Sequence, residues 1–279
     1  MIVNTFISDG GPIPEYTNIS LRQARKTNPN TDIRFICKDD QPIFSELNIE
    51  WVPQDSIGGN LLDHFNELCW FRRHGTPQTS HPSPELFWHR TAERIYYLQA
   101  YIDICNLESV FHFENDVLLY HDLSYVSTGD ELMVAPMSDN QTTFAIAYIP
   151  EKRHINNLCL YMNWLLSKGE ACLQQILKDH VSEMSLLNLA LREEGYLSAF
   201  ATLPQHANNF VFDPGSYGQF LGGTNNGHSS GFTDPKHIIG KLIDSGELNV
   251  KFDGEPSVNG VKIFNLHIHS KNLQEFAGV

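Results

Sequence analysis

The sequence predicts a single compact α/β domain whose central sheet is mostly parallel and is flanked by helices. Residues 2–7 and 33–37 are short apolar runs typical of strands, and residues 16–26 between them carry their apolar side chains on one helical face. A strand–helix–strand order with short turns favours parallel strands. No internal repeat, low-complexity tract or clear linker divides the 279 residues, so we expect one domain.

The rest of the chain continues the alternation of strands and helices. Residues 86–106 predict the longest helix, because apolar residues recur at helical spacing from Phe87 to Ile102. Two segments rich in small and polar residues, 75–85 and 213–235, predict loops. The remaining predicted elements are a glycine–proline turn at 8–14, strands at 49–52, 110–113, 132–137 and 143–149, helices at 61–73, 156–167 and 183–194, and a last strand within 261–273 that runs into a polar tip.

Composition limits the partners and the compartment of the chain. The 33 acidic and 19 basic residues give a formal net charge of −14, which repels phosphate backbones, so we expect no nucleic-acid partner. Five widely spaced cysteines without a CxxC pair indicate reduced thiols. The N-terminus lacks a basic segment, and no stretch reaches the roughly 18 apolar residues that cross a bilayer. We therefore expect a soluble cytoplasmic protein without a transmembrane segment, with peripheral membrane contact left open.

The stretch HFEND, residues 112–116, places two carboxylates and an amide at the end of a predicted central strand. Side chains two positions apart in an extended segment point the same way, so Glu114 and Asp116 are expected to face one side. Adjacent carboxylates repel unless one is protonated or a cation lies between them, and hard oxygen ligands suit Mg²⁺ or Mn²⁺. Ligands of open α/β sheets bind beyond the carboxyl ends of the strands. The alternative is a turn whose carboxylates are merely solvated.

The tail segment NLHIHSK, residues 265–271, has a second pair of candidate ligands. His267 and His269 are also two positions apart, and Lys271 follows them. Neutral imidazoles bind Mn²⁺ and Zn²⁺, and a lysine supplies a point charge for phosphates. An edge strand with one core histidine and one exposed histidine is the alternative. A zinc hydrolase also stays open, although the chain has no HExxH motif.

Taken in order, these segments resemble those of GT-A fold glycosyltransferases that use nucleotide sugars. HFEND resembles the DxD motif, with Glu114 in place of the first Asp and Asp116 in the last position; FWHRTAERIYYL leads into that strand and TFAIAYIP follows it. SEMSLLNLAL resembles the acidic helix start beside the acceptor, NLHIHSK the C-terminal metal and diphosphate segment, and FDPGSYGQFLGG a loop of some capsular or viral sugar transferases. The resemblance implies a Rossmann-like domain with a nucleotide-binding half at 1–120 and, at 121–279, an acceptor half that includes the metal and diphosphate segment.

The resemblance also implies the ligands and the activity. Asp116 would bind a divalent ion, Mn²⁺ or Mg²⁺, that bridges the two phosphates of the donor. Either His267 or His269 would complete the coordination, with His267 preferred, and Lys271 would contact the diphosphate. The implied reaction moves a sugar from a nucleoside-diphosphate sugar, with UDP as the expected nucleotide, to a hydroxyl group of a glycan or glycoconjugate acceptor.

The donor nucleotide and sugar are assigned to the first strand, its turn, the long helix and the acidic motif. These implied donor contacts are Thr5, Ile7, Ser8, Asp9, Arg90, Arg94, Glu114 and Asn115. For the two arginines, a helix-surface ion pair with Glu93 or another acid is the open alternative.

An inverting transferase also needs a base, an acidic side chain that takes the proton from the acceptor hydroxyl. Glu183 opens the predicted helix at 183–194, where the helix dipole favours its charged form, and Asp179 is the reserve. In a retaining enzyme Glu183 would position the substrate instead, and an ordinary helix-start residue is the third interpretation.

Two other functional classes stay open beside the glycosyltransferase. One is a sugar nucleotidyltransferase or metal-dependent hydrolase on a similar scaffold, although the turn SDGGPIP has no basic residue near it. The other is an inactive, carbohydrate-binding protein that keeps the transferase fold.

Overall fold

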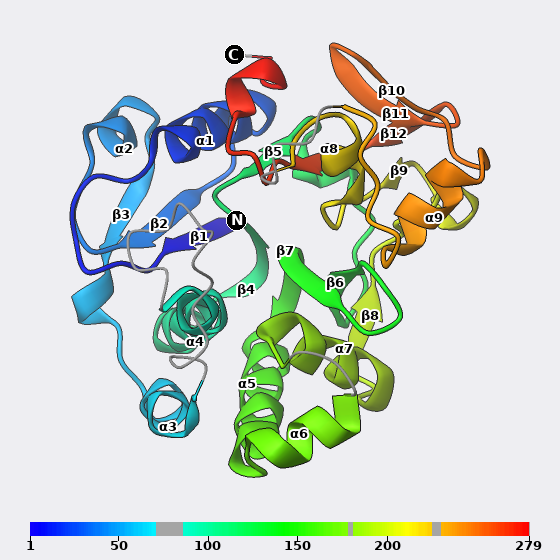
Figure 1. The fold of residues 1–279 in the computed structure, drawn as a ribbon. Coiled ribbons are helices and arrows are strands. Elements are labelled where there is room, and N and C mark those ends of the chain that lie inside the picture. The colour runs from blue at the N-terminus through cyan, green and yellow to red at the C-terminus, as the bar shows by residue number, and fades with distance from the viewer. Residues whose placement is uncertain (71–85, 178–180, 225–229, 279) are drawn as a thin grey trace.

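A seven-stranded sheet forms the centre of the protein (Figure 1). The computed structural model describes residues 1–70, 86–177, 181–224 and 230–278. The strand order of the central sheet is β3-β2-β1-β4-β7-β6-β8. These strands are β1 (Ile2–Phe6), β2 (Ile33–Cys37), β3 (Glu50–Pro53), β4 (Glu108–Phe113), β6 (Leu132–Pro136), β7 (Thr142–Glu151) and β8 (Leu197–Ala199).

The sheet is mostly parallel, as the sequence predicts. The neighbours β3, β2, β1 and β4 pair in parallel, and so do β6 and β8. Only β7 runs against its neighbours β4 and β6. The reason is the short connection of residues 137–141, because a turn of this length can join only antiparallel strands. The predicted α/β fold with a mostly parallel sheet is therefore confirmed.

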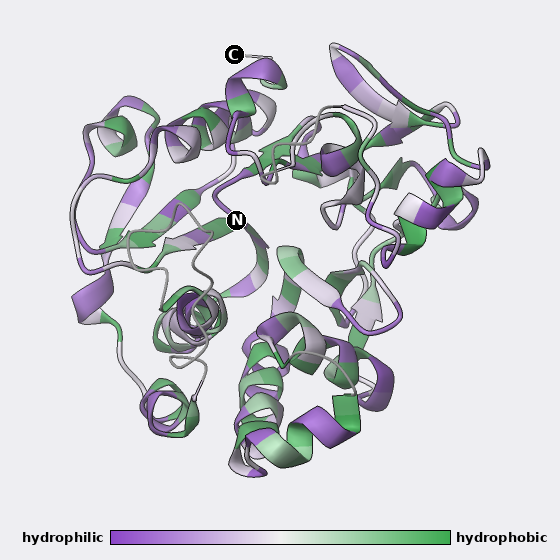
Figure 2. Ribbon diagram, in the orientation of Figure 1, coloured by the Kyte–Doolittle hydropathy of each residue, from purple (hydrophilic) through white to green (hydrophobic). Residues whose placement is uncertain are grey.

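Helices pack around the central sheet and around the smaller C-terminal sheets. They are α1 (Glu15–Thr27), α2 (Pro42–Glu46), α3 (Asn60–Leu68), α4 (Phe87–Cys105), α5 (Lys152–Ser167), α6 (Glu170–Leu177), α7 (Glu183–Glu193), α8 (Ser216–Phe220) and α9 (Ile238–Asp244). One core lies between the sheet and α3, α4, α5 and α7, and the other lies between the sheet and α1 and α2. Neighbouring residues of β1 face opposite cores: Ile2 belongs to the second core and Val3 to the first. Figure 2 shows the mixture of hydrophobic and hydrophilic residues along covering helices such as α1 and α5.

The C-terminal part adds two small sheets and a third core. A four-stranded sheet has the order β10-β11-β12-β9, and a two-stranded sheet pairs β13 with β5. Their strands are β5 (Val117–Leu119), β9 (Phe210–Val211), β10 (Val250–Asp253), β11 (Glu255–Val258), β12 (Val261–Ile263) and β13 (Asn265–His267). The third core packs between these strands, α8 and α9.

Three predicted elements need correction. The helix predicted at 61–73 ends at Leu68, because Cys69 adopts extended backbone angles; residues 71–73, like the loop predicted at 75–85, lie outside the described residues. The last strand is not continuous: Phe264 donates to Val211 and accepts from Tyr120, so the chain changes partner strand there. The loop predicted at 213–235 contains the short helix α8. In the part of the chain that the structure describes, no helix combines the length and hydrophobicity needed to span a bilayer.

Candidate active site

The HFEND motif forms a turn at the end of a central strand of the main sheet. Glu114, Asn115 and Asp116 connect β4 to β5, and the backbone N–H of Val117 donates to the carbonyl of Glu114 at 3.1 Å. The extended conformation assumed from the sequence is therefore wrong. The turn nevertheless brings both carboxylates to the same place, and the Asn115 amide fixes it to β1 by donating to the Thr5 carbonyl at 2.9 Å.

The tail histidine reaches this turn through strand pairing. Strand β13 is antiparallel to β5, with His267 opposite Val117, and the backbone N–H of Ile268 donates to the Asp116 carbonyl at 2.8 Å. This register places His267 Nε2 3.3 Å from Asp116 Oδ2 and 3.4 Å from Glu114 Oε2. Two segments about 150 positions apart in the chain thus meet at one point, as a shared site requires.

The charges of this cluster compensate one another. Lys271 forms an ion pair with Asp116, and its ammonium also lies 5.4 Å from the centre of the Tyr16 ring. Burial opposes ionisation of Asp116, but Lys271 and His267 outweigh it and hold the pKa of its carboxyl well below the usual range. Burial likewise disfavours a charged His267, yet Asp116 and Glu114 raise the pKa of this imidazole to about 10. The two carboxylates, Asp116 buried and Glu114 half-buried, are therefore balanced by the imidazole proton, by the lysine and by Arg94.

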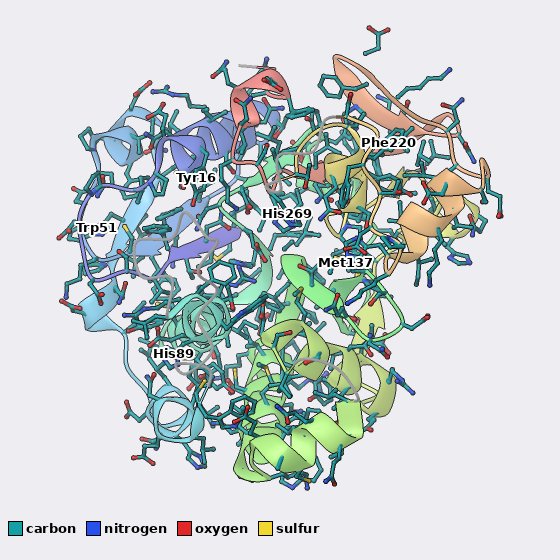
Figure 3. The ribbon with its side chains drawn as sticks, in the orientation of Figure 1. Tyr16, Trp51, His89, Met137, Phe220 and His269 are labelled. Atoms are coloured by element: carbon teal, nitrogen blue, oxygen red, sulfur yellow. The ribbon has the colours of Figure 1, made fainter. Side chains whose placement is uncertain are left out.

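The second tail histidine lies beside the first but outside the carboxylate cluster. The rings of His267 and His269 are 4.1 Å apart and nearly perpendicular, and Figure 3 shows His269 between Tyr16 and Phe220. The Gln219 amide donates to His269 Nδ1 at 3.0 Å. Burial and the neighbouring His267 lower the pKa of His269 to about 3, so this ring is neutral. The structure thus turns His267, rather than His269, toward the acidic motif.

Arg94 connects the acidic motif to the candidate base. Its Nη2 lies 2.5 Å from Glu114 Oε1 and 3.8 Å from Glu183 Oε1. Thr91, one turn earlier on α4, donates to Glu183 Oε2 at 3.2 Å. Burial, which Arg94 only partly offsets, raises the pKa of Glu183 to about 6, and the charge of Glu114 acts in the same direction. A carboxyl group with this pKa can exchange a proton near neutral pH. The reserve candidate, Asp179, lies outside the described residues.

The predicted donor contacts of the first strand and its turn are Thr5, Ile7, Ser8 and Asp9. Thr5 is held by Asn115, and the backbone N–H of Ser8 donates to Gln54 at 3.3 Å. Ile7 is buried.

Arg90 lies between this turn and its own helix. Its guanidinium contacts Asp9 at 2.8 Å and Glu93 at 2.5 Å. The ion pair that was the alternative to a donor contact is therefore present at Arg90. Arg94 is also ion-paired, with Glu114 of the acidic motif.

A loop and the helix α8 hold the tail in position, and their key residue, Asp213, was not among the predicted site residues. The carboxylate of Asp213 is fully buried and accepts four backbone N–H groups at 2.8 to 3.0 Å, from Gly215, Tyr217, Gly218 and His267. The sequence signal was the FDPGSYGQFLGG segment, in which an acid precedes closely spaced glycines.

The glycines of this segment allow its backbone to approach the histidines. A Cβ on Gly218 would lie 2.2 Å from the carbonyl oxygen of His267, and one on Gly215 would lie 3.0 Å from His269 Cε1. Gly215 also has a φ of +121°, which favours glycine. Tyr217 is fully buried and donates to the Thr202 carbonyl, so it fixes this segment to the core.

The ligand atoms of the carboxylate and imidazole cluster fit a divalent metal ion. One ligand atom from each of Glu114, Asp116 and His267 lies within 4.8 Å of the others. Two carboxylates and an imidazole suit Mn²⁺ or Mg²⁺, and an ion of this charge would take over the role of the imidazole proton and the lysine.

The comparisons with known proteins found only distant structural similarity. No protein-family model and no curated protein sequence matches the chain. Similar solved structures include the galactosyltransferase LgtC with donor and acceptor sugar analogues (16% identity, 84% of this chain, 80% of that chain, TM-score 0.44) and mouse xyloside xylosyltransferase 1 (6%, 72%, 84%, 0.47). The bifunctional glycosyltransferase WbbM is similar over 95% of this chain and 45% of its own (11% identity, TM-score 0.46). All three are glycosyltransferases, but similarity this low carries no argument about activity.

Proposed function

We propose that this protein is a metal-dependent glycosyltransferase that moves a sugar from a nucleoside-diphosphate sugar to a hydroxyl group of a glycan acceptor. The observation that carries the proposal is the cluster of half-buried Glu114 with buried Asp116 and His267, with Lys271 beside it, at the carboxyl end of a central strand. Burying two carboxylates is costly without a cationic partner. A diphosphate that departs with negative charge needs cationic groups at such a place.

The residues of the cluster have separate roles in this proposal. Asp116, His267 and Glu114 would hold a Mn²⁺ or Mg²⁺ ion, which when bound would neutralise charge on the diphosphate. Lys271, a third exposed, would leave Asp116 and contact the diphosphate directly. The nucleoside would lie against the first strand and its turn, from Thr5 to Asp9, with UDP as the expected nucleotide.

Glu183 is the proposed group on the acceptor side. In an inverting reaction its carboxylate would take the proton of the acceptor hydroxyl, and in a retaining reaction it would orient a sugar hydroxyl. Arg94 holds Glu183 and Glu114 together, so the acidic motif and the acceptor side keep a fixed geometry.

A thermal-shift panel tests this function. Nucleoside diphosphates with Mn²⁺ should raise the melting temperature of the wild-type protein by mass action, and the chelator EDTA should remove the effect. Incubation with the stabilising nucleotide sugar should release a nucleoside diphosphate. Release of pyrophosphate would instead favour a nucleotidyltransferase. Binding without any turnover, together with ligand binding that survives Asp116→Asn, would favour the inactive carbohydrate-binding protein.

A further inference from the structure

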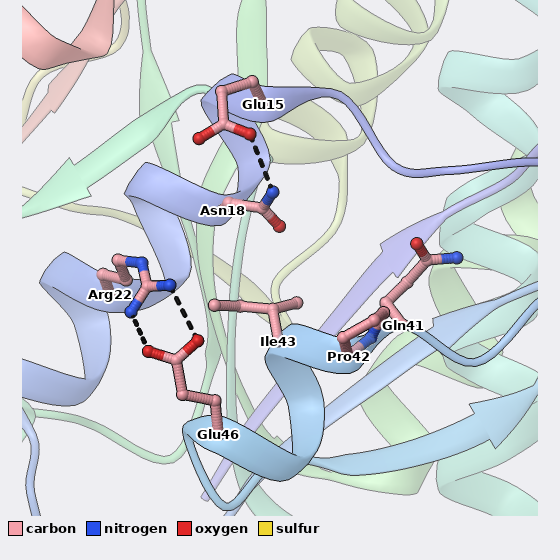
Figure 4. Close-up of a pocket in the computed structure, with 7 residues that line it drawn as sticks. All are labelled: Glu15, Asn18, Arg22, Gln41, Pro42, Ile43 and Glu46. Atoms are coloured by element: carbon pink, nitrogen blue, oxygen red, sulfur yellow. Dashed lines mark hydrogen bonds and ion pairs between the residues drawn. The ribbon is translucent and has the colours of Figure 1, made fainter.

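Two polar pockets of the described residues differ in how their charged side chains are paired. The first pocket, about 290 Å³, lies between α1 and α2 (Figure 4). It is lined by Glu15, Asn18, Arg22, Gln41, Pro42, Ile43 and Glu46. Both oxygens of Glu46 contact Arg22, and Asn18 donates to Glu15 at 3.1 Å. Its one cation, Arg22, is already paired with Glu46, so this pocket offers no unpaired positive charge to an anionic ligand.

The second pocket has unmatched cations. It measures about 320 Å³ and lies between the β6–β7 turn and the start of α9. It is lined by Ser138, Asp139, Asn140, Gln141, Pro235, Lys236 and Lys241, and we call it the lysine pocket. Ion pairs of described lysines involve Lys38, Lys152, Lys262 and Lys271, but within this part of the chain none involves Lys236 or Lys241. Two free ammonium groups against one exposed aspartate are notable in a chain of net charge −14.

One side of the lysine pocket is connected to the tail histidines. The backbone N–H of Ile238, at the start of α9, donates to the carbonyl of Met137 at 3.1 Å, which joins α9 to the β6–β7 turn (Figure 1). His237 Nδ1 lies 3.0 Å from the hydroxyl of Ser216, the first residue of α8. The preceding residue, Gly215, is the one that packs against His269.

The other side is connected to the candidate base. Thr142 directly follows the pocket residue Gln141, and its hydroxyl accepts from the Asn188 amide at 3.2 Å. Asn188 belongs to α7, the helix that Glu183 begins. The segments that line the lysine pocket are therefore connected by hydrogen bonds to α7, which begins with Glu183, and to α8, which follows Gly215 beside His269.

We propose that the lysine pocket binds an anionic group of the glycan acceptor, a carboxylate or a phosphate, while the acceptor hydroxyl lies toward Glu183. Lys236 and Lys241 supply the charge, and the amides of Asn140 and Gln141 supply neutral hydrogen-bond donors. The single acid of the pocket lining, Asp139, is exposed, and the two lysine charges outnumber it, so an anionic ligand is favoured over a cationic one. The inference rests on the proposed function and names the class of acceptor.

Direct binding of small probes to the intact chain tests this assignment. Isothermal titration at low ionic strength compares D-glucuronate, D-glucose 6-phosphate and neutral D-glucose, so that the carboxylate and the phosphate are distinguished. The variants are Lys236→Gln with Lys241→Gln, and the matched control is Lys251→Gln with Lys262→Gln, which removes two exposed lysine charges from the β10–β12 region.

At least one anionic sugar should bind the wild-type protein more tightly than glucose, and the pocket variant should weaken it about ten-fold or more, because hydrogen bonds to charged groups are lost. The control should keep the wild-type affinity. Equal binding of glucose, absence of anion binding to the wild type, or unchanged affinity in the pocket variant would overturn the assignment.

The nucleotide panel keeps the two proposals apart. The pocket variant should retain the full Mn²⁺-dependent melting shift with nucleoside diphosphates, because neither lysine belongs to the carboxylate cluster. A wild-type protein that binds the anionic sugar but shows no nucleotide shift would refute the glycosyltransferase function, and a nucleotide shift without anion binding would refute the acceptor class alone.

Discussion

The two halves of the candidate site are held in place by different means. The sheet-held half, Glu114 and Asp116, follows β4 of a seven-stranded sheet that is covered on both faces. The tail half, His267 to Lys271, ends a two-stranded sheet and depends on the buried carboxylate of Asp213 and on close glycine contacts. A lost side chain leaves the large sheet intact, whereas the tail has few substitutes for its contacts. A substitution in the sheet-held half should therefore act on stability through lost ion pairs, and one in the tail half through lost backbone contacts.

Asp116→Asn should give the largest loss of function. The change removes a charged ligand atom and the partner of both His267 and Lys271, so transfer activity should fall by about a thousand-fold, the upper range for loss of one electrostatic group at a reacting centre. Stability without metal should fall as well, because Lys271 and His267 hold the pKa of Asp116 well below its usual range, so the ionised carboxylate stabilises the folded protein. Activity assays and melting curves of the same preparation check both parts.

Asp130→Asn is the control for this substitution, because Asp130 is exposed and the chemical change is the same. An Asp116→Asn protein with near-normal activity would contradict the proposed function. An unchanged melting temperature without metal would contradict the stabilising role of the ion pairs of Asp116.

Asp213→Asn should weaken the tail half in both respects. An amide has only one acceptor oxygen, so some of the four backbone N–H groups lose their partner, at a cost on the order of 3 kcal/mol of unfolding free energy. Urea unfolding measures this loss, and Mn²⁺ titration of the folded protein should show weaker binding, since His267 is one of the four donors. Unfolding at the wild-type midpoint would contradict the dependence of the tail on Asp213.

Gly218→Ala should act on the tail half through space instead of charge. The new methyl group would meet the His267 carbonyl oxygen, so the backbone must shift, at about 1–3 kcal/mol as for other overpacked sites. Gly58→Ala is the control, because a Cβ at Gly58 has no described neighbour within 4 Å. Equal melting temperatures of the two variants would show that the loop moves away at no cost.

The same division explains what could be predicted from the sequence. The alternation of strands and helices is a local pattern, and it predicted the mostly parallel sheet. The acidic motif was expected at the end of a central strand, but the turn that it forms there was not predicted. Two further features were not predicted. The antiparallel direction of β7 depends on the five-residue connection before it, and the change of partner strand at Phe264 depends on contacts with residues distant in sequence. Asp213 was missed because its partners are backbone N–H groups, which leave no side-chain pattern.

Glu183→Gln should separate function from stability, because it is expected to stabilise the protein while it lowers activity. Burial raises the pKa of Glu183 to about 6 from its usual value of 4.5, so ionising this group disfavours the folded state above that pH. The stability that the neutral form provides is complete below pH 4.5 and is lost as the pH rises through about 6. At pH 8 the glutamine variant should therefore be more stable by up to about 2 kcal/mol, and at pH 4 the two proteins should be equal.

Activity should show the opposite preference. A base must be ionised, so kcat/KM of the wild type should fall as the pH drops through about 6, and the glutamine variant should lose this limb of the profile along with most of its rate. Glu194→Gln, just past the other end of α7, should change neither quantity. Urea unfolding at both pH values and a pH–rate profile provide the measurements. Equal stability at pH 8 would remove the evidence that Glu183 is kept at a cost to the fold, and would leave it an ordinary helix-start residue.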